Sequence, residues 1–235
     1  MKVYIGWDKA EADAYNVAAA SLERCSGLVA EPLEVERLRS VGLLQRPVDD
    51  RGQKYDFISN APCSTDFAAS RFLVPILCQS GWALFTDCDM VFHDDPRKLL
   101  DEVADSKYAV QVVKHQPHGG GTKMGGMVQT TYPRKNWSSV ILFNCDHPAN
   151  QRLTLYDVNN RPGRSLHAFY WLHDSEIGEL PSRWNWLVNV EAEIENPAIT
   201  HFTKGGPWLS EWAQRNYDDI WLKAYEETYG RPYRI

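Results

Sequence analysis

The chain has 235 residues and a mass of 26.9 kDa, and 43% of its residues are hydrophobic, so a single large domain spanning residues 1–235 is expected. Its formal net charge of −6 argues against broad electrostatic capture of nucleic acid or anionic membrane. Five scattered cysteines without a Cys-x-x-Cys pair exclude an obvious disulfide framework or structural zinc site. With no leader and no stretch of membrane-spanning length, we expect a soluble, cytoplasmic protein.

The opening of the chain predicts an α/β unit. Residues 2–6 are typical of a strand, residues 7–9 of a turn, and residues 11–25 of a helix. The apolar residues of this helix recur at helical spacing: Ala14, Val17, Ala18 and Leu22. A second strand is predicted at residues 33–35, and residues 39–61, with Gly, Pro and paired Asp, are predicted to be irregular.

Helices and strands are predicted to alternate in the middle of the chain. A helix is expected from Thr65 to about Gln79, kinked or shortened by Pro75. After the central strand, Asp-Asp-Pro at residues 94–96 is an N-cap signal for a helix that ends near residue 105. A β-branched strand is expected at residues 108–113.

The central stretch, residues 82–92, is an apolar run that ends in Asp87 and Asp89 and then continues at once. This pattern predicts a buried strand whose end delivers acid groups to a cleft. Two carboxylates at spacing two can both reach a hard divalent cation when the backbone turns, and such a site leaves positions open for phosphate oxygens. The alternative is that one Asp caps the following turn and the other is solvated.

The second half is predicted to contain a long loop and then further alternating elements. Residues 115–135 are rich in Gly and too long for an idle connection, which indicates a mobile loop over the site. The remaining elements are expected in this order: a strand at 138–143, helices at 148–159 and 166–173, an extended segment at 179–190, a short strand at 200–202 and a helix at 210–229 bearing Trp212, Tyr217, Trp221 and Tyr225.

Six segments occur in a recognisable order: residues 3–8 with Ser21-Leu22, 70–75, 85–89, 138–144, 180–186 and 201–208. In this order they resemble the GT-A-fold glycosyltransferases, closest to the glycogenin and galactosyltransferase-like group called family eight. The resemblance covers nearly the whole chain. It implies a single Rossmann-like α/β domain with a mixed, mostly parallel central sheet flanked by helices.

The resemblance also implies a metal site. Asp87, Asp89 and His201 would ligate Mn²⁺ or Mg²⁺, which bridges the diphosphate of a nucleotide sugar, by default a UDP-sugar. The physical chemistry agrees, because oxygen and imidazole donors suit Mn²⁺ and a diphosphate leaving group needs its charge neutralised. For a lone His, the alternative is a structural role.

Further donor-binding residues follow from the same resemblance. Ile5, Gly6 and Asp8 would border the nucleoside, and Arg71 would reach ribose, phosphate or a carboxylate beside the donor. The alternatives are that Asp8 caps the first helix and that Arg71 forms a helix-surface ion pair. The remaining donor-binding residues implied are Cys88, between the two aspartates, and Lys204 with the backbone amides of Gly205 and Gly206, which would act on the leaving group.

The implied reaction transfers a hexosyl or pentosyl group with retention, by front-face attack of the acceptor hydroxyl while the departing phosphate accepts its proton. Asp174 or Glu176, with Asp174 favoured, would contact the donor sugar and stabilise an oxocarbenium-like transition state, unless both are ordinary surface acids. The sequence departs from that of relatives around Asp174 and Glu176 and again at residues 136–139. The interval from His201 to Pro207 is also one residue shorter than in glycogenin, which shifts the position of Lys204.

Two other functions fit parts of the sequence. The central motif also matches haloacid-dehalogenase-like phosphohydrolases, in which Asp87 would attack phosphorus and Asp89 act as acid/base. The Trp-rich second half also suits a non-catalytic nucleotide-sugar or glycan binder. For a transferase, the acceptor is a glycan, a lipid-linked sugar, a protein or a modified nucleic acid, received by the loop with Lys114, Lys123, Arg134 and Lys135.

Overall fold

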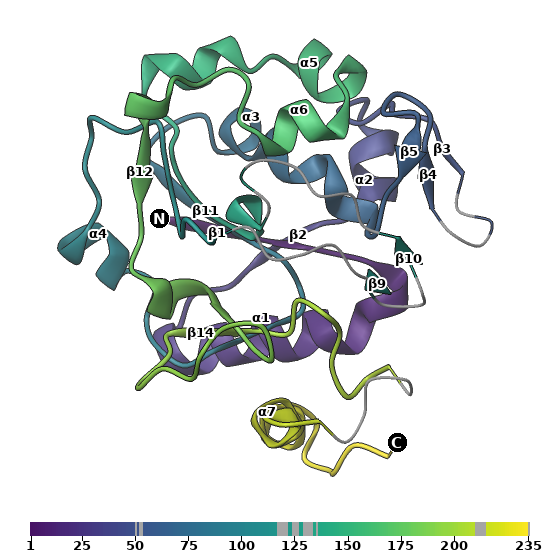
Figure 1. Ribbon diagram of the computed structural model, residues 1–235, viewed down its shortest axis with the longest axis vertical. Coiled ribbons are helices and arrows are strands. Elements are labelled where there is room, and N and C mark those ends of the chain that lie inside the picture. The colour runs from purple at the N-terminus through teal and green to yellow at the C-terminus, as the bar shows by residue number, and fades with distance from the viewer. Residues whose placement is uncertain are drawn as a thin grey trace.

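A six-stranded sheet forms the centre of the molecule in the computed structural model, which describes residues 1–49, 51, 54–116, 122–123, 127–128, 134, 136–209 and 215–234 (Figure 1). The strand order is β12-β8-β11-β6-β1-β2. Every pairing is parallel except the two made by β11. The mixed, mostly parallel sheet predicted from the sequence is therefore confirmed. Its strands are β1 (Lys2–Gly6), β2 (Glu31–Leu33), β6 (Trp82–Thr86), β8 (Val110–Val112), β11 (Val140–Asn144) and β12 (Ile177–Glu179).

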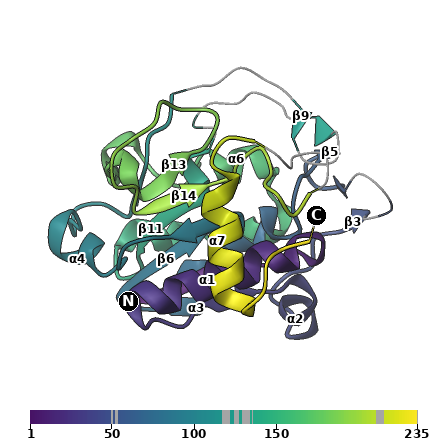
Figure 2. The ribbon, with the colours of Figure 1, turned by 90° about the horizontal axis from the view of Figure 1, so that it is seen from below.

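Helices lie on both faces of this sheet, as Figure 1 shows. The first, α1 (Ala12–Ser26), buries the predicted stripe of Ala14, Val17, Ala18 and Leu22, and it ends at Gly27 in the left-handed conformation. Figure 2 shows α7 (Asp218–Tyr229) crossing α1 on the outer side. The other helices are short: α2 (Val35–Ser40), α3 (Val74–Cys78), α4 (Lys98–Glu102), α5 (Leu155–Asn160) and α6 (Gly163–His167). No helix among the described residues combines the length and apolarity needed to cross a bilayer.

Several predicted helices are shorter than expected. The helix predicted from Thr65 to Gln79 is two 3₁₀ helices, Asp66–Ala68 and Ser70–Leu73, followed by α3. Pro75 lies in the first turn of α3, where its missing N–H costs nothing, whereas it would interrupt a longer helix.

The same shortening occurs later in the chain. Residues 148–159 form a 3₁₀ helix (Pro148–Arg152) and then α5, which restarts at a capping box on Thr154. The last helix begins only at Asp218, because Tyr217 has φ 70°; of the predicted start, residues 210–214 lie outside the described residues.

Two small hairpin-like sheets were not predicted. The antiparallel strands β3 (Val48–Asp49), β4 (Tyr55–Asp56) and β5 (Ala61–Pro62) fall in the stretch expected to be irregular. Buried Arg46 holds this sheet by pairing with Asp56 and by donating to the Val158 carbonyl at 2.8 Å. In the predicted mobile loop, β9 (Thr122–Lys123) pairs with β10 (Met127–Val128), and most of the remaining loop lies outside the described residues.

A three-stranded sheet next to the main one positions the site. Its order is β13 (Trp186–Leu187), β14 (Ile199–His201) and β7 (Met90–Phe92). The chain leaves the main sheet at the end of β6 and enters this second sheet at β7, so residues 87–89 form the bend between the two sheets. An aromatic cluster around Trp221 packs α7 against the second sheet.

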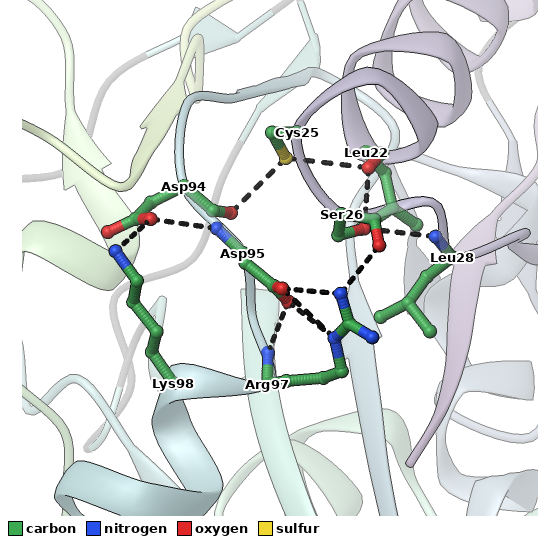
Figure 3. A network of polar contacts seen from close by, with 8 residues as sticks. All are labelled: Leu22, Cys25, Ser26, Leu28, Asp94, Asp95, Arg97 and Lys98. Carbon is green, nitrogen blue, oxygen red and sulfur yellow. Dashed lines mark hydrogen bonds and ion pairs between the residues drawn. The ribbon is translucent and has the colours of Figure 1, made fainter.

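A polar network fastens the end of α1 to the loop after β7 (Figure 3). The Cys25 thiol donates to the Asp94 carbonyl at 3.3 Å, and Arg97 donates to the Ser26 carbonyl at 2.7 Å. The Asp94 carboxylate itself accepts from Lys98 at 2.6 Å and from Arg183 at 2.7 Å. Burial alone would raise the pKa of Asp94, but these hydrogen bonds outweigh it and lower the pKa to about 2.

Asp94→Asn is expected to remove a pH-dependent part of the stability. Because the pKa of Asp94 is lower in the folded state than its ordinary value of 3.8, the carboxylate stabilises the fold above about pH 4, and this contribution is lost as the pH falls through about 2. Urea unfolding should show a wild-type advantage on the order of 1 kcal/mol at pH 6, reduced for solvent screening, that shrinks toward pH 2. The exposed Asp101→Asn is the control; a constant difference for Asp94→Asn would contradict the assignment.

Candidate functional site

Asp87, Asp89 and His201 come together at the bend between the two sheets. One ligand atom from each lies within 4.8 Å of the others, and no second group of this kind occurs among the described residues. His201 Nε2 is 3.4 Å from Asp89 Oδ1. Asp89 and His201 are buried, and Asp87 is partly exposed. Residues more than a hundred positions apart thus form one compact donor set.

Backbone pairing explains why these residues meet. β14 pairs antiparallel with β7 so that His201 lies opposite Met90, next to Asp89. The Phe202 amide donates to the Asp89 carbonyl at 2.9 Å. On the other side, the Asp87 amide donates to the Ser139 carbonyl at 2.9 Å, so both ends of the bend are fixed by hydrogen bonds.

Asn185 orients the His201 ring. Its side-chain amide nitrogen donates to Ser139 Oγ at 2.9 Å, and that hydroxyl donates to the Asn136 carbonyl at 2.7 Å. The Asn185 oxygen is therefore the atom that accepts from His201 Nδ1, at 2.9 Å. This arrangement leaves Nε2 as the basic nitrogen beside Asp89, the arrangement that metal-ligating histidines use.

Arg71 forms an ion pair with one of the two acids. Its guanidinium lies 2.7 Å from Asp87 Oδ1 and donates to the Ser138 carbonyl at 2.8 Å. It also lies over the rings of Phe67 and Phe85, at 5.3 and 4.9 Å from their centroids. Arg71 is buried, so the alternative of an ion pair on a helix surface does not apply. Of ribose, phosphate and a carboxylate, the structure shows a contact with a carboxylate, that of Asp87.

The donor set suits a divalent cation. Two carboxylates and an imidazole combine the hard oxygen and nitrogen ligands that Mn²⁺ accepts, and Mg²⁺ accepts the oxygens readily. Acids this close repel each other when both are ionised, and a bound cation removes that repulsion. Residues Asp87, Asp89 and His201 therefore fit the metal expected from the sequence.

A cavity of about 700 Å³ lies beside the carboxyl end of β1. Asp8 in its wall accepts from the Ala10 and Asp66 amides, each at 2.9 Å, and is paired with Lys54. The capping role of Asp8 is therefore real, and its carboxylate still borders the cavity. Ile5 and Gly6 pack inward instead: Ile5 is buried, and a Cβ on Gly6 would meet the Phe67 ring at 2.4 Å.

The segment after His201 is shaped by its glycines. Gly205 has φ 113° and its amide donates to the Phe202 carbonyl at 2.7 Å, while a Cβ on Gly206 would meet the Trp208 ring at 2.1 Å. Lys204 is exposed, and its Nζ is 3.5 Å from the Asn189 carbonyl. Between the two aspartates, the Cys88 side chain is fully buried, and burial raises the pKa of its thiol well above the ordinary value.

The structure does not bring Asp174 and Glu176 into this cluster. Both precede β12, which runs parallel to β8, and neither belongs to the group formed by Asp87, Asp89 and His201. The Asp174 side chain is 92% exposed and pairs with Arg134. Glu176 pairs with Arg152 and also accepts from the His173 amide at 2.7 Å.

Sequence reasoning missed the residues that support the site. Asn185 lies inside one of the recognised segments, but nothing in its spacing from His201 indicated a contact. The pair of buried His115 and partly exposed Glu191, joined at 2.8 Å, links residues 76 positions apart that carry no common motif. Their only signal was chemical type, a His at the start of the predicted loop of residues 115–135.

Comparisons with known proteins give one relative in sequence and several in fold. No protein-family model matches the chain. Protein CDI of Arabidopsis thaliana is 40% identical over 235 residues, covering 96% of this chain and 86% of that protein.

Among solved structures, the glycosyltransferase GlyE of Streptococcus pneumoniae TIGR4 superposes with a TM-score of 0.57 at 14% identity, covering 95% of this chain but only 59% of that one. The galactosyltransferase LgtC, in complex with donor and acceptor sugar analogues, has a TM-score of 0.56 at 13% identity, covering 99% and 98%. The fold is therefore that of GT-A glycosyltransferases.

Asn185→Leu is expected to weaken Mn²⁺ binding by about 10- to 100-fold, because the His201 ring loses the acceptor that holds its tautomer and orientation. Isothermal titration with Mn²⁺ measures the effect. Asn185→Asp, which keeps an acceptor for Nδ1–H, is the matched control and should retain most of the affinity. Wild-type affinity in Asn185→Leu would show that this hydrogen bond does not serve a metal.

Proposed function

The chain belongs to the same family as Protein CDI of Arabidopsis thaliana, and we propose that it is a divalent-metal-dependent glycosyltransferase using a nucleotide-sugar donor, a UDP-sugar. One observation carries the proposal: the cluster of Asp87, Asp89 and His201 at the carboxyl edge of a GT-A sheet. Ligands of open α/β sheets bind in the crevice outside the carboxyl ends of the strands. The acceptor is a hydroxyl group.

The nucleoside is assigned to the cavity beside β1. The volume of this cavity, about 700 Å³, falls within the range of small-molecule sites. Ala68 and Ala69 line its wall and shortly precede Arg71 in the chain, and Arg71 contacts Asp87. In this proposal a nucleoside in the cavity has its diphosphate end directed toward the acid cluster. Asp8 and Lys54 supply an acceptor and a donor at the cavity wall.

The residues of the cluster have distinct tasks in this proposal. A divalent ion held there would supply positive charge to the diphosphate leaving group as its bond to the sugar breaks. Asn185 keeps His201 Nε2 available as a ligand, and Arg71 holds the Asp87 carboxylate in place. Lys204, exposed on the segment that follows His201, supplies a further cation for the leaving group.

Transfer with retention is the outcome we propose. In front-face attack the departing phosphate accepts the proton of the acceptor hydroxyl, so the protein need not provide a carboxylate base. Asp174 and Glu176 each pair with an arginine and lie outside the donor set, which is compatible with such a reaction. Stabilisation of the leaving group then carries most of the rate enhancement.

The phosphohydrolase alternative is less well supported. It requires Asp87 as an attacking nucleophile, yet this carboxylate is engaged by Arg71 at 2.7 Å and lies in a donor set with His201. A second acidic pair would have to come from Asp218-Asp219, which begins α7 on the outer side of α1. A non-catalytic binder differs from the proposal only in turnover.

Asp89→Ala is expected to lower Mn²⁺-dependent release of nucleoside diphosphate from nucleotide sugars by at least about 100-fold, because the metal loses a buried ligand. The assay follows UDP release from a panel of UDP-sugars, which occurs slowly by hydrolysis even without an acceptor. Circular dichroism checks the fold, and exposed Asp101→Ala is the control. Unchanged turnover, or hydrolysis of phosphomonoesters by the wild type, would contradict the proposed function.

A further inference from the structure

A pair of a buried histidine and a partly exposed carboxylate lies near the acid cluster and has no part in the function described above. His115 Nδ1 is 2.8 Å from Glu191 Oε1, and Glu191 Oε2 accepts from the Leu187 amide at 3.3 Å. The His115 side chain is only 1% exposed. Its second ring nitrogen, Nε2, is buried and has no hydrogen-bond partner in the described part of the chain.

Hydrogen bonds and strand pairing link both residues of the pair to the cluster of Asp87, Asp89 and His201. His115 follows β8, whose carboxyl end lies at the same edge of the sheet as that of β6. The 3₁₀ helix Trp137–Ser139 contacts His115 at one end and Asp87 at the other, through the Trp137 indole N–H at 3.0 Å and the Ser139 carbonyl at 2.9 Å. On the other side, Leu187 lies opposite His201 in the pairing of β13 with β14.

The hydrogen bonds of the pair determine what Nε2 can do. A carboxylate accepts only, so Nδ1 carries the proton toward Glu191, and in the neutral ring Nε2 is left with a lone pair. A buried acceptor without a donor is costly, and a ligand hydroxyl would remove that cost. Sugars are dense in hydroxyl donors.

The strand order places His115 where a donor sugar would extend. The nucleoside cavity lies at β1, the acid cluster follows β6, and β11 and β8 come next along the sheet. A nucleotide sugar that runs from the cavity past the cluster continues over β11 toward β8. Two strand spacings amount to about 10 Å, a distance that a hexose beyond the diphosphate can span.

We infer that His115 Nε2 accepts a hydrogen bond from a hydroxyl of the donor sugar, and that Glu191 is a positioning residue that fixes the tautomer and orientation of the His115 ring. This inference rests on the proposed function. It assigns the sugar end of the donor to the edge beside β8, while Asp87, Asp89 and His201 serve the diphosphate. The pair discriminates the sugar, and the cavity discriminates the nucleoside.

The experiment separates sugar binding from nucleotide binding. Titrations in Mn²⁺ compare UDP with UDP-glucose, UDP-galactose, UDP-N-acetylglucosamine and UDP-xylose for the wild type, His115→Phe and Glu191→Gln. His115→Phe should weaken the preferred UDP-sugar by about five- to tenfold and leave UDP within about twofold of wild type. Glu191→Gln should give a smaller loss of the same kind. Glu193→Gln is the matched control, because Glu193 is exposed on the same segment and bonds Tyr217 instead of His115.

Each result bears on the inference. Selective loss of UDP-sugar affinity supports it, because a merely structural role of His115 would weaken UDP and UDP-sugar alike or leave both unchanged. Equal losses, or no loss, in His115→Phe overturn the inference and leave the proposed function intact, provided that the wild type binds a UDP-sugar. A wild type that binds neither UDP nor any of the UDP-sugars in Mn²⁺ overturns the proposed function and the inference with it.

Discussion

The repulsion between two acids at one bend of the chain is the constraint on which the site depends. Backbone hydrogen bonds hold Asp87 and Asp89 close together on both sides of the bend: the Asp87 amide donates to the Ser139 carbonyl, and the Phe202 amide donates to the Asp89 carbonyl. Arg71 offsets part of the charge on Asp87, and the imidazole of His201, oriented by Asn185, lies beside Asp89. A divalent cation would complete this balance, which is why the cluster carries the proposed function.

The three parts of the proposed site lie one after another along one edge of the sheet. The cavity at β1, the acid cluster after β6 and the His115–Glu191 pair after β8 follow the sequence of strands in space, although the chain visits them with long excursions between. In the proposed reaction these positions correspond to the nucleoside, the diphosphate and the sugar of one extended donor. The carboxylates at residues 174 and 176 pair with Arg134 and Arg152 and lie outside the donor set.

Long and strongly patterned elements were predictable, and short ones were not. β1, β6, β11 and α1 are buried runs or periodic stripes, so apolar periodicity alone located them. The strands β3 to β5 have two residues each, too few for any alternation to show, and they depend on the buried contact of Arg46 with Asp56. The helix expected from Thr65 to Gln79 is shortened, as Pro75 indicated, because proline can begin a helix but removes a hydrogen bond inside one.

The sequence by itself determined the α/β class, the central strand and the chemical types of the ligand-bearing residues, because these are local properties of composition and spacing. Only the tertiary structure decided which of them meet. The pairing of β14 with β7 brings His201 to Asp89, buried Arg71 pairs with Asp87, and Asp174 and Glu176 pair with arginines outside the donor set. Strand register and direction are long-range choices made by packing, which no stretch of neighbouring residues records.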